Sequence, residues 1–217
     1  MRCEDIDERL SAHRLEVLGG FHPAPEDGTP EGCETLLMIG PREPGFWAHV
    51  TAEPEFGDGA PDPLDRWSRR VIGRLACDLR AKALFPFGGP PWHPFIGWAK
   101  RTGRAHASPV TLLVHDRAGL MVSYRGALAL RERVALPAPP PMPCAPCPRP
   151  CETACPVGAL SEAGYDVEAC HAFLDTESGR DCLDRGCRVR RACPVSETYG
   201  RRPEQSAFHM RSFHPWR

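Results

Sequence analysis

The chain has 217 residues, of which 41% are apolar, so it is long enough for one medium domain and a second small one. Its net charge is −1, and arginines alternate with acidic residues, so no basic field of the kind that binds nucleic acid is present. No apolar stretch approaches the length of a membrane span. We therefore expect neither nucleic acid nor a membrane as a partner.

Two elements are predicted before residue 60. Apolar residues recur at helical spacing over residues 5–18 and stop at Gly19-Gly20, which indicates a helix that ends at glycine. The short apolar run Glu34–Gly40 is bounded by glycine and predicts a buried strand. A helix followed by a strand favours a mixed α and β domain.

The clearest helix is predicted over residues 62–79. Asp62 supplies an N-cap, Pro63 a first-turn proline, and apolar residues follow at three-and-four spacing. Residues 83–88 are expected to form an edge strand. The loop from Gly88 to Trp98 is dense in proline and tryptophan, and its aromatic side chains suit either the wall of a flat cofactor or a cover for the sheet.

Two apolar runs, residues 108–115 and 120–126, flank Asp116–Gly119 and predict a hairpin. Helices that alternate with strands and end in a hairpin indicate an α/β sandwich. No Gly-x-Gly-x-x-Gly turn or phosphate loop is present, so a nucleotide cofactor is not indicated. We therefore assign residues 1–136 to an α/β sandwich domain in a protein of the α+β class.

Prolines mark the sharpest boundary in the chain. Five of them fall within residues 137–143, which are expected to be an extended, semi-rigid connector. Residues 144–200 then form a small second domain, and residues 201–217 form an apolar C-terminal tail that is expected to pack back on the protein or to dock a partner. The stiff connector leads us to expect the second domain's first cysteines near residues 110–126.

Cysteines dominate the second domain. Eight of the chain's eleven cysteines follow residue 143, in two sets that close on Cys155-Pro156 and Cys193-Pro194. Eight thiolates are the ligand count of two four-iron clusters, because each such cluster takes four cysteine sulfurs. We expect two [4Fe-4S] clusters, with metal ligands Cys144, Cys147, Cys151, Cys155, Cys170, Cys182, Cys187 and Cys193.

Disulfide bonds and structural zinc are two other uses of closely spaced cysteines. A disulfide framework needs an oxidising compartment, whereas the charged residues 1–9 are unlike a secretory signal, so we expect reduced thiols and a cytoplasmic protein. Structural zinc is the stronger rival, since Cys-x-x-Cys pairs and four thiolates suit it as well. Zinc ribbons usually space two such pairs far apart, whereas four cysteines here crowd into residues 144–155.

The run from Cys144 to Pro156 resembles the cysteine motif of bacterial ferredoxins. Its gaps are two, three and three residues, where the ferredoxin motif has two, two and three. In two-cluster ferredoxins the fourth cysteine of each motif ligates the other cluster. The resemblance therefore implies a first cysteine set of Cys144, Cys147, Cys151 and Cys193, and a second cysteine set of Cys155, Cys170, Cys182 and Cys187.

A second resemblance concerns the order of the parts. Residues 109–130 are similar to the end of the corrinoid-binding domain shared by epoxyqueuosine reductases and cobalamin-processing proteins, and Cys170–Glu177 is similar to the reductase segment that supplies a second-cluster cysteine. This resemblance implies cobalamin as a further cofactor. The chain departs from the reductase in two respects: Leu84–Gly89 contains no carboxylate that could donate a proton, and no tRNA-binding repeat domain follows the cysteines.

Function is expected to follow from the clusters. We expect an electron-transfer protein that delivers electrons to a partner protein or to a cofactor in its N-terminal domain. A corrinoid-dependent reductase or corrinoid reductant is one alternative, and a zinc-stapled interaction protein is another. His171 could replace a thiolate, as in Rieske centres, but eight cysteines suffice without it. Catalytic residues are not indicated.

Overall fold

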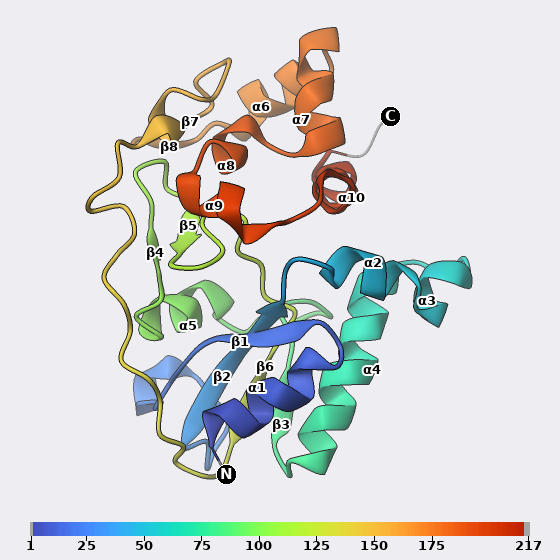
Figure 1. The fold of residues 1–217 in the computed structure, drawn as a ribbon, viewed down its shortest axis with the longest axis vertical. Coiled ribbons are helices and arrows are strands. Elements are labelled where there is room, and N and C mark those ends of the chain that lie inside the picture. The colour runs from blue at the N-terminus through green and yellow to red at the C-terminus, as the bar shows by residue number, and fades with distance from the viewer. Residues whose placement is uncertain (1, 215–217) are drawn as a thin grey trace. The chain divides into compact units, whose positions relative to one another are not determined.

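The computed structural model describes residues 2–214 (Figure 1). The chain divides into two compact units, the first made of Met1–Arg104 with Ser123–Pro140, the second of Ala105–Val122 with Pro141–Arg217. Both units combine helices with small sheets, so the protein belongs to the α+β class. Among the described helices, none has the length and apolar character needed to cross a membrane.

The first unit is built on a four-stranded antiparallel sheet. Its strand order is β1-β2-β6-β3, with β1 at Leu15–Phe21, β2 at Thr35–Pro41, β6 at Gly126–Leu130 and β3 at Lys82–Leu84. Every residue of β2 and β6 is buried, which is the pattern of central strands covered on both faces. The strand β3 lies at the edge, as its sequence predicts.

Helices cover this sheet. Helix α1 (Cys3–Ser11) and helix α5 (Phe95–Arg101) contact β1, whereas α4 (Pro63–Asp78) contacts β3 and β6 (Figure 1). The predicted helix over residues 62–79 is confirmed as α4, and it buries Trp67 and Ile72 completely. Two short helices, α2 (Phe46–Thr51) and α3 (Pro54–Gly57), precede α4, and a 3₁₀ turn spans Pro25–Asp27.

The helix predicted over residues 5–18 is wrong in its second half. It ends at Ser11, and Leu15–Phe21 is the strand β1. The pairing of β1 with β2 shifts register between Val17 and Gly20, so buried positions recur at a spacing of three instead of two. The spacing of three resembles the apolar spacing of a helix, which explains why a helix was predicted. The pair Gly19-Gly20, predicted to end that helix, lies inside the strand β1.

The predicted hairpin is also wrong in part. Strand β4 (Ala105–Ala107) pairs with β5 (Leu113–His115), and residues 120–125 form no strand. The next strand, β6, starts at Gly126 and pairs with β2 in the first unit. Residues 105–122 belong to the second unit with the cysteines, although the sequence pattern assigns them to the N-terminal domain.

The second unit consists of short elements. Besides β4 and β5 it holds the two-stranded pair β7 (Leu160–Ser161) and β8 (Gly164–Tyr165). Its helices and 3₁₀ turns are η2 (Pro150–Glu152), α6 (Val167–Leu174), η3 (Glu177–Gly179), α7 (Arg180–Arg185), α8 (Arg188–Arg191), α9 (Pro194–Tyr199) and α10 (Pro203–Phe213). Helix α10 is the predicted tail and packs against α7; residues 215–217 lie outside the described part.

Candidate metal centres

The eight cysteines are placed by short helices and the turns between them. Cys144 and Cys147 lie in a turn, Cys151 in η2 and Cys155 in the loop before Pro156. Cys170 lies in α6, Cys182 in α7, and Cys187 and Cys193 are the N-cap residues of α8 and α9. Pro194 begins α9 and holds Cys193 in an extended conformation, because proline favours the first helical position and disfavours a helical residue before it.

The first cysteine set comes together around a buried apolar cluster. Cys151 and Cys193 are buried in this cluster, and Cys144 packs against it. The pKa of the Cys144 thiol is raised, first by burial and then by the nearby sulfurs of Cys147, Cys151 and Cys193. Burial also raises the pKa of Cys151, and the sulfur of Cys193 raises it further. The sulfurs of Cys147, Cys151 and Cys193 therefore all lie within electrostatic range of Cys144.

The second cysteine set is linked in the same way. Burial raises the pKa of the Cys170 thiol, and Cys187 and Cys155 raise it further. Burial raises the pKa of Cys182 too, with Cys187 again a contributor. Cys187 is thus near both Cys170 and Cys182, and Cys155 is near Cys170. These pKa effects connect cysteines within each of the two sets that the ferredoxin resemblance implies.

Hydrogen-bond donors point at several of these sulfurs. The backbone amide of Arg149 donates to Cys147 at 3.3 Å, and that of Ala159 donates to Cys155 at 3.2 Å. The Tyr165 hydroxyl donates to the Cys170 sulfur at 3.2 Å. Such bonds stabilise a thiolate more than a thiol, because the charged acceptor makes the stronger hydrogen bond. Donors of this kind orient the ligands of metal sites in proteins.

The segment from residue 105 to residue 122 forms one wall of the first set. Val110, Val114 and Leu120 are buried in the apolar cluster that contains Cys151 and Cys193. Cys155 and Cys187 of the second set pack against the same cluster, so the two sets adjoin. The first cysteine set thus packs against the part of the predicted hairpin that belongs to the second unit.

Arg190 is a cation beside the second set. Its guanidinium donates to the Leu120 carbonyl, and Cys187 and Tyr165 lie within electrostatic range of it. Burial lowers the pKa of Arg190, while Cys187 and Tyr165 act in the opposite direction. No carboxylate pairs with it among residues 2–214. Because an unpaired charge is costly to bury, this position suits an anionic group, and a metal centre with four thiolate ligands is one.

Over residues 2–214, no three His, Cys, Asp or Glu side chains form a group that could hold a metal ion. All eleven cysteines are free thiols. His171 follows Cys170, yet its ring contacts the rings of Phe213 and His214, and its Nε2 atom has no hydrogen-bond partner. The structure thus gives His171 an aromatic setting instead of a place among the sulfurs.

Two residues of the site were missed from the sequence. Tyr165 lies five residues before Cys170, and only the folded chain brings its hydroxyl to the Cys170 sulfur. Arg190 lies in the run Arg188-Val-Arg-Arg191, and nothing in that run distinguishes one arginine from the others. A tyrosine beside a cysteine motif is the one signal that could have been followed.

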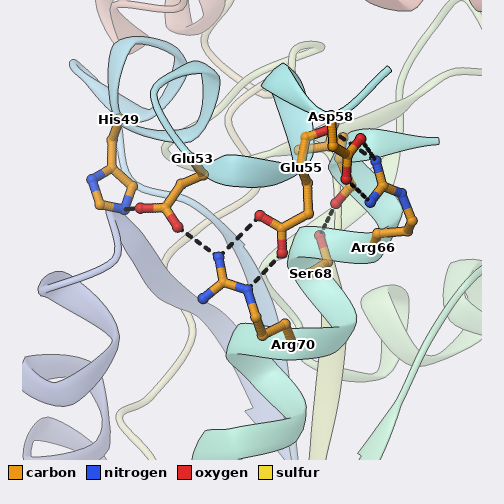
Figure 2. A network of polar contacts seen from close by, with 8 residues as sticks. His49, Glu53, Glu55, Asp58, Arg66, Ser68 and Arg70 are labelled. Atoms are coloured by element: carbon orange, nitrogen blue, oxygen red, sulfur yellow. Dashed lines mark hydrogen bonds and ion pairs between the residues drawn. The ribbon is translucent and has the colours of Figure 1, made fainter. Parts of the chain in front are cut away.

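Polar residues of the first unit form a separate network (Figure 2). Arg70 of α4 bridges Glu53 and Glu55, with nitrogen–oxygen distances of 2.6 and 2.5 Å, and His49 lies 3.9 Å from Glu53. Arg66 pairs with Asp58 at 2.6 Å. Both arginines of α4 thus form ion pairs with carboxylates in or next to α3, and these pairs join the two helices.

The first unit also has an open pocket of about 490 Å³, lined by Asp27, Trp98, Lys100 and Arg101 among others. Asp27 and Arg101 form an ion pair at 2.9 Å, and the Trp98 indole donates to the Asp27 carbonyl at 2.7 Å. Trp98 is the one residue of the predicted aromatic loop among these four. Asp27, Trp98 and Arg101 are thus bonded to one another within this pocket.

Comparisons with known proteins add no relative to this picture. No protein-family model matches the chain, and no curated protein or solved structure is similar to it.

Proposed function

We propose that this chain is an electron-transfer protein that holds two [4Fe-4S] clusters, one at each cysteine set. The observation that carries the proposal is the crossed grouping of the thiols. Cys193 shares one apolar cluster with Cys144 and Cys151, although it follows them by more than forty positions, and Cys155 lies within electrostatic range of Cys170. Exchange of the last cysteine between two motifs is the ligation pattern of two-cluster ferredoxins.

The chemistry of the donor set fits this group. Each thiolate of a four-iron cluster binds a different iron, so the sulfurs surround the cluster and do not converge on one ion. Soft sulfur ligands match iron, and amide and hydroxyl donors to sulfur stabilise the added charge of the reduced state. Four thiolates also suit zinc, so the test has to separate the two metals.

The chain's own residues would perform three tasks in this function. The eight thiolates would hold the clusters, which when bound take up and release single electrons. Val110, Val114 and Leu120 would exclude water from one side of the first set. Amide and hydroxyl donors would hold the sulfurs in orientation. Because the two sets adjoin, an electron could pass between them before it leaves for a redox partner protein or a small-molecule acceptor.

Anaerobic reconstitution of the full chain tests the proposal. We expect about eight irons and eight sulfides per chain and a brown protein whose colour bleaches on reduction. A Cys151→Ala variant should retain about half of the iron, since it removes a ligand of one cluster only. The control is Cys77→Ala, which changes an exposed cysteine of the first unit and should retain all of it. A colourless protein that takes zinc and refuses iron would disprove the proposal.

A further inference from the structure

The two cysteine sets differ in the cations that face them. Arg190 lies in α8, three residues after its N-cap Cys187 and within electrostatic range of it, and Arg149 lies within electrostatic range of Cys144 in the first set. Both arginines are close enough to act on a bound cluster, since the charge near a cluster is one determinant of its reduction potential. What separates the two arginines is their pairing with acids and their exposure to water.

Arg190 carries an unneutralised charge within electrostatic range of Cys187 of the second set. Its neighbours on α8, Arg188 and Arg191, both pair with Asp181, the first of them at 2.9 Å. Arg190 has no such partner among the described residues, and its guanidinium is fixed by the bond to the Leu120 carbonyl. Its charge is therefore neither neutralised by a carboxylate nor free to swing into solvent.

Arg149 acts more weakly on the first set. Its side chain is 52% exposed and lies 3.7 Å from the Glu152 carboxylate. Water and a paired acid both reduce the field that an arginine exerts on a neighbour. The cation at the first set is thus screened, whereas the cation at the second set is not.

Tyr165 strengthens the difference. Its hydroxyl donates to the Cys170 sulfur at 3.2 Å, and Arg190 is among its charged neighbours. A hydrogen bond to a ligand sulfur favours the reduced, more negative cluster, as a nearby cation does. No side-chain donor to a sulfur of the first set is found in the described residues; its donor there is the Arg149 amide.

We propose that Arg190 makes the second cysteine set the site of the higher-potential cluster, so that an electron entering the protein comes to rest there. This inference rests on the proposed function. Each reduction adds one electron from a one-electron donor to one cluster, and no bond to the protein forms or breaks. Tyr165 contributes to the same preference through its bond to Cys170.

A redox titration of the anaerobic holoprotein, followed by electron paramagnetic resonance, tests this. The wild-type protein should show two one-electron waves, and Cys187→Ala should lose the upper one while Cys151→Ala loses the lower one. In Arg190→Gln the reduction potential of the upper wave should fall by at least about 59 mV, which is a tenfold change in the equilibrium constant for one-electron reduction. The potential of the lower wave should not change. Tyr165→Phe should lower the same wave by less.

Two further variants keep the result interpretable. Arg191→Gln removes a neighbouring charge that Asp181 already neutralises, so both waves should stay in place. Arg190→Lys keeps the charge and should retain the upper wave, even where Arg190→Gln fails to assemble the second cluster. An Arg190→Gln protein with eight irons and an unchanged upper wave would overturn this inference alone, and so would a shift of the lower wave. A wild-type protein without iron would overturn the proposed function along with it.

Discussion

The hydroxyl of Ser196 accepts a hydrogen bond from the backbone amide of Leu120 at 2.8 Å. Ser196 lies in α9, the helix that starts directly after Cys193, and Leu120 lies in the wall of the first cysteine set. Arg201 adds a second bond, from its guanidinium to the Met121 carbonyl at 3.0 Å. Residues far apart in the sequence thus fix the position of Cys193.

We predict that Ser196→Ala destabilises the second unit by about 1–2 kcal/mol, because it leaves the Leu120 amide without its buried acceptor. The first cluster should then be lost faster than in the wild type, since α9 carries Cys193. Urea unfolding and the decay of visible absorbance measure the two effects. Thr198→Ala on the exposed side of the same helix is the control and should change stability by less than about 0.5 kcal/mol. Equal stability of the two variants would contradict the prediction.

Gly119 shows a closer dependence on Ser196. Its φ angle is +55°, and a Cβ atom there would lie 2.4 Å from the Ser196 backbone nitrogen. We predict that Gly119→Ala costs more than about 2 kcal/mol, since it combines left-handed strain with a backbone clash. Gly158→Ala is the matched control, because its φ is +63° and a Cβ would meet nothing within 4 Å. It should cost only the strain, about 1–2 kcal/mol. Similar losses in both variants would argue against the close contact.

The sequence predicted those elements whose signals are local. Helix α4 carries its own start signal at Pro63 and a regular apolar spacing, so it could be identified, although the side chain of the predicted N-cap Asp62 makes no capping hydrogen bond. Strand β1 could not, because its irregular pairing with β2 depends on a partner that the local pattern does not contain. Residues 120–125 have the apolar pattern of a strand, but β6 begins only at Gly126, because the pairing with β2 and β3 starts there. Sheet edges are decided by tertiary contacts.

The candidate site divides in the same way. The cysteines were found by count and spacing, which need no fold. The role proposed for Arg190 could not be found from count and spacing. It depends on two contacts of the folded chain: Asp181 pairs with the neighbouring Arg188 and Arg191, and the Leu120 carbonyl binds the guanidinium of Arg190. These relations exist only in the folded chain.

Pairs of substitutions test the crossed grouping directly. Cys151→Ala with Cys193→Ala removes two ligands from the same set, so about four irons should remain. Cys151→Ala with Cys187→Ala removes one ligand from each set, so both clusters should be lost. Iron and sulfide assays after anaerobic reconstitution measure this. If the first pair lost all iron and the second pair kept half, the sets would be assigned incorrectly.

Glu55 provides a prediction for the first unit (Figure 2). Its carboxylate is 10% exposed and accepts from Arg70, and this hydrogen bond holds the pKa of Glu55 below its usual value of about 4.3. A lowered pKa in the folded state gives stability that is present above the unfolded pKa and is lost as the pH falls through the folded one. We expect Glu55→Gln to lower the free energy of unfolding by about 1 kcal/mol from pH 5 to 8, and by less below about pH 4. The loss is small because Arg70 is half exposed, so water screens its interaction with Glu55. Urea unfolding followed by tryptophan fluorescence measures it, with exposed Glu31→Gln as the control; a cost independent of pH would show that the charge of Glu55 contributes nothing.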